Sequence, residues 1–438
     1  MPRRRLVCTT AGILLIAAST LAQTAPPPPL RVESVYPRHA PRGQTTVVNV
    51  AVPSPETVQS VEISPSAGVT VAGIRGTGSG SEQNIGWWEV TLDVAQDAAP
   101  GDRSLVLILR TNRTAPVPLV IATHAPAISD LRVMPPPQPN QAAAELRLNV
   151  VDAANDLGES PYLWFTADCG GEPIAGAVRA RVDAGVLRAP LPDLAAEKCD
   201  VQVRVTDATG IESKTLKTSA TLPRTIAPVL TPAGGATASD EQWNEFASRE
   251  DRFTITFPGR PQVTETTWTS QYGAILPTHI YTGRQGSGRY SVTVVDYNPV
   301  ERLLCERSRT LPALDLAVHE YGPGYWKTDV RSGVIFAASK YLEKDGKVTN
   351  MFANFADLVA GMQLQFTSNA DQSRTYASIY MHDNRLVIAE ATVPRGYPAP
   401  LIFQQSLGWL DENGNRIRYQ YMNYNEPDAP KPPGRGGR

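Results

Sequence analysis

Apolar and polar residues alternate in short runs through the first half of the chain. Val48, Val50 and Val52, for example, alternate with Asn49 and Ala51, and Gly or Pro turns separate such runs. Because neighbouring side chains of a strand point to opposite faces, this alternation predicts half-buried β-strands. Roughly seven runs over about 95 residues predict an immunoglobulin-like β-sandwich at 30–125. A second stretch with the same pattern predicts another such sandwich at 126–222.

The pattern changes after a Pro-, Ala-, Gly- and Thr-rich segment at 223–239, which we interpret as a linker. A capping box at 239–242 predicts a helix that begins just before Trp243. Val334 and Ala338 stand at helical spacing, and Gly346 is expected to end that helix. Strands gathered with helices predict an α+β domain at 240–425. Within it, strands are expected at 253–257, 280–281, 290–295, 376–381 and 386–392, and a short helix at 401–410.

Short motifs in both halves of the chain resemble known families. The run PRG at 41–43 before a Thr/Val strand, and the PG turn at 100–101, resemble bacterial immunoglobulin-like modules of the IPT/TIG type. The runs FTITFPG at 253–259 and FQQSL at 403–407 resemble the PsbP/Mog1-like fold, from which a long insertion at 299–322 departs. This resemblance implies an interaction or assembly module, and it carries over no catalytic residue.

The first residues have the pattern of a secretory signal peptide at 1–22. Arg3, Arg4 and Arg5 precede an apolar run at 6–18 and small residues at 20–22. The apolar run is shorter than the roughly 20 residues that span a bilayer, so we expect cleavage and a periplasmic or secreted protein. Sec and twin-arginine export both remain open. A stiff Pro-rich spacer is expected at 23–29, and a disordered tail at 426–438.

Two cysteines are placed to form a disulfide. Cys169 shares one face of a predicted strand with alternate residues of 163–167, and Cys199 shares a face of another with those of 201–205. Both side chains therefore point to the same core, which favours a bond in an exported protein. Two buried free thiols are the alternative. Cys305 is left over, either as a small buried hydrophobe or as a reactive thiol.

Composition excludes several classes of protein. Lys and Arg number 41 and Asp and Glu 43, for a net charge of −2, which argues against a basic nucleic-acid binder. The five His residues form no HExxH pair, and no CxxC pair is present, so we predict no metal site, no cofactor and no catalytic residue. We interpret the polar residues 382–385 as a hairpin turn, because adjacent strand residues point to opposite faces.

Aromatic rings are the strongest candidates for a binding surface. Trp87 falls on the polar side of its strand, and Tyr419 and Tyr421 line a late strand, so they are candidate contacts for a partner or a glycan. Packing between domains is the alternative. Glu390 shares the apolar side of its strand and is expected to pair with Arg374 or to face a groove.

These features together predict an exported, non-enzymatic envelope protein. The sandwiches would act as spacers or adhesion units, and the α+β domain would bind another envelope protein. One alternative is a carbohydrate-binding or cell-surface adhesion protein. Another is a hydrolase that uses a pocket in the last domain. The identity of the partner and the oligomeric state do not follow from the sequence.

Overall fold

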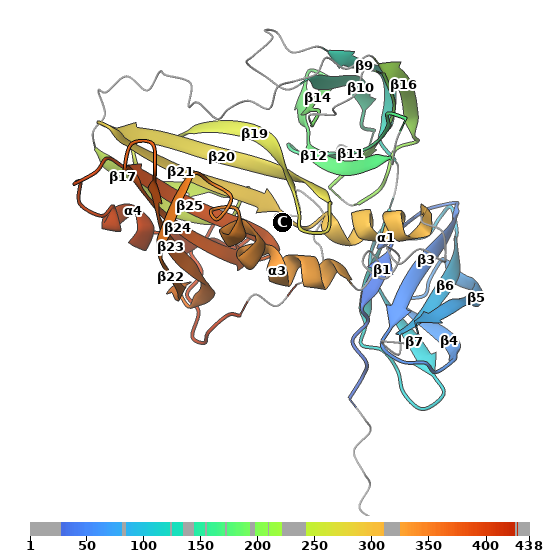
Figure 1. Cartoon of the computed structure of the whole chain (residues 1–438). Coiled ribbons are helices and arrows are strands. Elements are labelled where there is room, and N and C mark those ends of the chain that lie inside the picture. The colour runs from blue at the N-terminus through green and yellow to red at the C-terminus, as the bar shows by residue number, and fades with distance from the viewer. Residues whose placement is uncertain are drawn as a thin grey trace, which may run out of the picture.

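The computed structural model describes residues 28–427 except 81–84, 123–124, 135–143, 154–155, 171–172, 193–197, 209, 221–241, 311–324 and 425–426. The predicted signal peptide and linker lie outside the described residues, as do nearly all of the predicted spacer and tail and the side chain of Cys305. The described chain is mostly β, with several sheets and little helix (Figure 1).

The first part of the chain is a β-sandwich of two four-stranded sheets. Valine and leucine side chains from both sheets fill the space between them, among them the alternating Val48, Val50 and Val52. One sheet contains β1 (Ser34–Tyr36), β3 (Thr45–Val52), β6 (Ile85–Val94) and β5 (Val69–Gly80). The other contains β2 (His39–Pro41), β8 (Val117–Ala122), β7 (Gly101–Leu109) and β4 (Val58–Ser64).

A second sandwich follows, and a common core joins its two sheets. One sheet contains β13 (Arg181–Asp183), β14 (Val186–Pro190), β10 (Glu145–Val151) and β9 (Ala127–Met134). The facing strands are β16 (Leu216–Ala220), β15 (Cys199–Thr206), β11 (Tyr162–Asp168) and β12 (Ile174–Arg179). These facing strands are the first part of a much longer sheet.

The long sheet runs from the second sandwich into the C-terminal part of the chain. β12 pairs in parallel with β20 at Gly176 and Ile275, and the sheet then continues to its last strand, β22 (Gly346–Ala356). The predicted linker therefore connects two parts of one sheet. In between lie β20 (Ile275–Gln285), β21 (Gly288–Asp296), β25 (Arg385–Val393), β24 (Arg374–His382) and β23 (Val359–Ser368), and β19 (Gln262–Thr269) pairs with β20.

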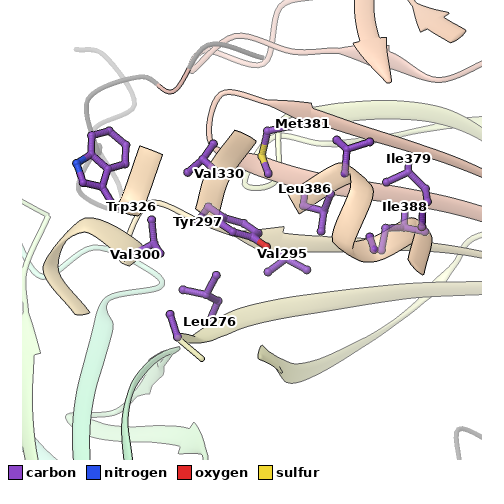
Figure 2. Close-up of a cluster of buried hydrophobic side chains, with 14 of the residues drawn as sticks. Leu276, Val295, Tyr297, Val300, Trp326, Val330, Ile379, Met381, Leu386 and Ile388 are labelled. Carbon is purple, nitrogen blue, oxygen red and sulfur yellow. The ribbon is translucent and has the colours of Figure 1, made fainter. Parts of the chain in front are cut away.

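Different elements cover the two faces of the C-terminal sheet. Helix α3 (Tyr325–Ser339) packs on one face, where Val330 lies among buried side chains that include Met381 and Leu386 (Figure 2). The opposite face packs against aromatic residues of a small sheet and against α4 (Leu401–Gln405). The small sheet contains β17 (Trp243–Ser248), β18 (Phe253–Pro258) and β26 (Gly408–Trp409).

The prediction of a helix that begins just before Trp243 is wrong, because Trp243 begins strand β17. Phe246 packs its ring against Phe253, Phe257 and Tyr281, so tertiary contacts decide this segment. The capping pattern reports only a local preference, which tertiary packing readily overrides.

Two other helices differ from their predicted bounds. α3 begins earlier than expected and ends at Ser339, and Gly346 opens β22 instead of closing the helix. α4 ends at Gln405, because Gly408 and Trp409 pair with β18. The insertion at 299–322 contains a further helix, α1 (Val300–Thr310), which the sequence analysis did not predict.

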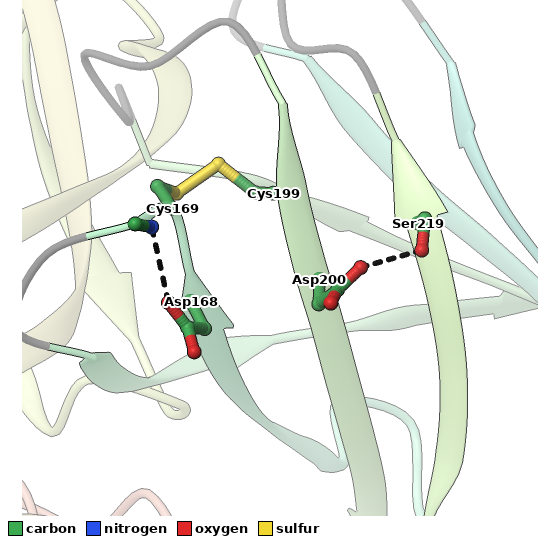
Figure 3. The surroundings of a disulfide bond; sticks show 6 residues. Asp168, Cys169, Cys199, Asp200 and Ser219 are labelled. Atoms are coloured by element: carbon green, nitrogen blue, oxygen red, sulfur yellow. Dashed lines mark hydrogen bonds between the residues drawn. A yellow bond between two sulfur atoms is a disulfide. The ribbon is translucent and has the colours of Figure 1, made fainter.

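A disulfide joins Cys169, just after β11, to Cys199 at the start of β15 (Figure 3). Cys199 is fully buried in the core of the second sandwich, on the same face as Val201, Val203 and Val205. The bond therefore fastens two paired strands of one sheet where their pairing ends.

We predict that replacing both Cys169 and Cys199 with serine lowers the free energy of unfolding by about 3–4 kcal/mol. In the chain-entropy model, closure of a loop of 30 residues restricts the unfolded chain by this amount. Denaturant unfolding of the second sandwich measures the change, with the reduced wild type as the control. An unchanged unfolding transition in both samples would contradict the prediction.

Candidate functional site

Helix α1 lies where the first sandwich, the second sandwich and the C-terminal sheet meet (Figure 1). Its Glu301 is buried and accepts hydrogen bonds from Ser34 Oγ at 3.0 Å and from the backbone N–H of Val35 at 2.9 Å. Arg38 forms an ion pair with the same carboxylate at 3.0 Å. One residue of α1 therefore holds the first strand and the following turn of the first sandwich.

The next residue of α1, Arg302, binds the second sandwich. Its guanidinium stacks on Trp164, with Cζ 3.7 Å from the ring centroid, and pairs with Glu212 at 2.8 Å. It also pairs with Glu306 on its own helix at 3.0 Å. The hydroxyl of Tyr36 in the first sandwich lies 3.1 Å from a carboxylate oxygen of each of Glu212 and Glu306 and shares its one proton between them. The hydrogen bonds and ion pairs around Arg302 thus include residues of all three parts of the chain.

Charges at this junction balance. Arg38, Arg204 and Arg302 face Glu212, Glu301 and Glu306. Burial by itself would raise the pKa of Glu306, but Arg302 and Arg204 outweigh it and hold the pKa below its ordinary value. Burial also lowers the pKa of His39 to about 4, so its imidazole is neutral at pH 7.

A second group of buried polar contacts joins the second sandwich to the C-terminal sheet. Asp296 at the end of β21 pairs with Arg179 and accepts a hydrogen bond from Tyr162. All three side chains are buried. Burial by itself would raise the pKa of Asp296, but Arg179 outweighs it and holds the pKa well below its ordinary value.

A buried acid–base pair lies beside the Arg179–Asp296 ion pair. His279 Nδ1 is 2.7 Å from Asp251 Oδ2, and Tyr281 donates to the same carboxylate at 2.7 Å. Such a pair suits general acid–base catalysis only where a substrate reaches it. His279 is 7% exposed and Asp251 5%, and Arg179 and Thr278 help to close the space beside the ring. The geometry therefore fits a structural hydrogen-bond network.

The polar run at 382–385 forms the turn between β24 and β25. Asp383 and Asn384 both have positive φ, 49° and 54°, and Asp383 pairs with Arg252 at 2.6 Å. His382 is stacked on Trp409 and lies 2.7 Å from the hydroxyl of Tyr419. These contacts hold the hairpin against the small sheet.

The three predicted aromatic contacts do not form one surface. Trp87 belongs to β6 of the first sandwich, where it is half-buried. Tyr419 is also half-buried, packed against the small sheet. Tyr421 is 84% exposed.

The expected pairing of Arg374 with Glu390 is not what the structure shows. Glu390 pairs with Lys344 at 3.6 Å, and Arg374 donates to the carbonyl of Tyr397. Glu390 lies opposite Ala377 in the sheet, three residues away from Arg374. The sequence could not show that Lys344, just beyond α3, approaches this strand.

Strand β22 is unusually exposed to solvent for a strand of its length. Residues 349–353 are all exposed, and Met351 (48%) and Phe352 (47%) point to opposite faces. Met351 lies opposite Leu364 of β23, which is 2% exposed in the core beneath α3. The edge strand is therefore covered near its ends, at Val348 and Ala356, and exposed in its middle.

The exposed apolar area continues past the end of β22. The ring of Phe355 lies 6.5 Å from that of Tyr424, edge to face. Asn423 forms backbone hydrogen bonds with both Leu358 and Ala360, so residues 422–424 run beside the turn. We call these exposed side chains the edge surface: Met351, Phe352, Phe355, Leu358, Met422 and Tyr424. Contiguous exposed apolar side chains commonly mark an interaction site.

The turn that ends β22 is strained. Asp357 and Leu358 both have positive φ, 43° and 66°. Asn, Asp and Gly tolerate this region, whereas Leu does so only at a cost. The turn at 383–384 has the same geometry with the favoured residue types. Leu358 is thus kept at the edge surface despite its backbone preference.

Sequence reasoning missed the edge surface. The run KVTNMFANFA at 347–356 contains apolar residues on both sides of the strand, so it shows no alternation. The one sequence feature that could have indicated an exposed strand here is this long stretch, in which Lys347 is the sole charged residue.

The described residues show neither a cluster of metal-binding side chains nor a helix that could span a membrane. No group of three or more His, Cys, Asp or Glu side chains is placed to hold a metal ion in the described part of the chain. Within the same residues, no helix combines the length and the apolar character needed to cross a bilayer.

No protein-family model matches the chain, and no curated protein matches it. Many solved structures are distantly similar, among them the following three. Chicken CNTN1 FN1–FN3 domains share 11% identity over 45% of this chain and 68% of that chain, with a TM-score of 0.17. The Escherichia coli adhesin FdeC shares 10% over 90% and 97%, with a TM-score of 0.18. The Yersinia pseudotuberculosis adhesin InvE shares 12% over 82% and 97%, with a TM-score of 0.16. TM-scores this low carry no inference about function.

We predict that Arg302→Met opens the junction. The substitution removes the stacking on Trp164 and leaves Arg204 as the remaining cation beside Glu212 and Glu306, which destabilises by about 1–3 kcal/mol. Small-angle scattering should show a larger radius of gyration, and the melting temperature should fall. Arg188→Met, at an exposed position of β14, is the matched control. Equal radii and melting temperatures for the two variants would contradict the role of Arg302.

We predict that Leu358→Asn stabilises the chain by about 1 kcal/mol, because Asn accepts positive φ more readily than Leu. Denaturant unfolding of the variant and the wild type measures the gain. Asp383→Asn, in the turn with favoured residues, should give no comparable gain. A loss of stability in Leu358→Asn would show that the leucine side chain has packing value in the isolated chain.

Proposed function

We propose that the chain is an exported, non-enzymatic protein-interaction or assembly module that binds a protein partner in the cell envelope through its edge surface. The bare strand β22 carries the proposal, because its exposed apolar side chains and open backbone edge suit a macromolecular partner. The disulfide supports export, since such bonds persist in oxidising compartments. The predicted signal peptide at 1–22 accords with a periplasmic or secreted location.

In this proposal, the parts of the chain have separate tasks. The two sandwiches are immunoglobulin-like spacers, and the region at 240–425 is a PsbP/Mog1-like α+β interaction module. The junction at α1 supports this division, because its buried ion pairs hold the parts in one arrangement. A fixed arrangement lowers the conformational entropy that is lost on binding.

Adhesion through carbohydrate is the second candidate function. The observation that favours it is Tyr421, whose ring is 84% exposed and free to stack on a sugar. This function would depend on Tyr421 and not on the backbone of β22. Glycan binding that is lost in Tyr421→Ala and kept in Phe352→Ala would favour it over protein binding.

We test the proposed function by placing a photo-cross-linking amino acid at position 352 in cells that make the protein naturally. The matched control carries it at position 335 on α3, where Ile335 is 66% exposed. We expect an adduct with one protein, reproducibly, from position 352 and none from position 335. That protein is either another envelope component or a second copy of this chain. The absence of any protein adduct at position 352 would contradict the proposal.

A further inference from the structure

We infer that the occupant of the edge surface is strand β22 of a second copy of this chain, paired antiparallel about a two-fold axis. This inference rests on the proposed function and names its partner. In the described residues, β22 pairs with β23 on one side and with no strand on the other. Its outer edge thus presents a row of backbone N–H and C=O groups.

The chemistry of that row selects a strand as the occupant. Backbone donors and acceptors at the spacing of a β-sheet are matched by another extended chain, whereas a helix satisfies its own backbone groups. The exposed side chains stand on both faces of β22, as Met351 and Phe352 show. A partner docked on one face would leave the other bare, but an added strand extends both faces together.

The charge of β22 favours its own sequence as the added strand, in the antiparallel direction. Lys347, near its beginning, is its one charged residue, so a second copy of β22 brings a single like charge to the pairing, and only the relative direction of the strands decides whether the two lysines meet. Parallel pairing in register would set the two lysines side by side, and like charges directly opposite each other are destabilising. Antiparallel pairing centred on Met351 separates them by eight residues, roughly 27 Å, well beyond the screening length in physiological salt.

Antiparallel pairing in this register is also self-complementary. Met351 would face its own copy across the two-fold axis, and Asn350 would face Phe352. Lys347 lies beyond the register shift between Val348 and Asn350 and would come near Phe355. No charged residue would meet a like charge. Isologous contacts of this kind close on themselves, so pairing stops at a dimer and does not continue into a filament.

The experiment is a charge swap at the two-fold axis, measured by sedimentation velocity on the purified chain. Wild type should be a dimer. Met351→Lys and Met351→Glu should each raise the dimer Kd by about tenfold or more, because like charges would then face each other. An equimolar mixture of the two variants should restore the dimer. Ile335→Lys, at an exposed position of α3, is the control and should dimerise as wild type does. Circular dichroism confirms that every variant is folded.

Two results would overturn the inference. One is a wild type that stays monomeric up to about 100 μM, a concentration at which even weak pairing is visible. The other is a dimer that the Met351 variants leave unchanged or that their mixture does not restore, because pairing would then use another surface. Either result leaves the proposed function standing if position 352 cross-links to a different protein. Either result together with no protein adduct at position 352 removes both.

Discussion

The arrangement of this protein depends on the guanidinium of Arg302. It stacks on Trp164 of the second sandwich and pairs with Glu212 and Glu306. The hydroxyl of Tyr36 in the first sandwich lies within hydrogen-bond distance of both carboxylates. An arginine suits this place because its planar group can stack and pair at the same time. Removing this cation would leave Arg204 as the one described cation beside Glu212 and Glu306 and would take away the stacking on Trp164, so contacts among all three parts would be weakened together.

Fixing the parts at α1 has a consequence for the surface at the far end of the sheet. β22 is the last strand beyond β23, and it lies away from the first sandwich (Figure 1). The hydrogen-bonded sheet runs from the second sandwich to this strand through the single bridge between β12 and β20, which Arg179 and Asp296 reinforce. The position of β22 relative to the second sandwich therefore depends on this bridge, on the Arg179–Asp296 ion pair and on the contacts at α1.

The groups that look catalytic and the groups that look adhesive lie in opposite environments. His279 and Asp251 form a well-made pair, but they are enclosed and serve the packing between the sheets. The edge surface contains no acid or base and is open to solvent. Polar groups that are buried and closed to solvent commonly stabilise the fold through hydrogen bonds, whereas exposed apolar side chains commonly mark a binding surface.

Local patterns were enough to predict strands, their buried faces and the positions of Cys169 and Cys199, because a two-residue period reports which side of a strand is buried. The tertiary structure alone decided the rest. Ser34 and Glu301 are 267 positions apart and become partners only when the parts pack together. Trp243 follows a capping pattern yet joins a sheet, since aromatic packing outweighs a local preference. The bare edge of β22 depends on where α3 ends its cover and which strand comes last, and no short window of sequence carries that information.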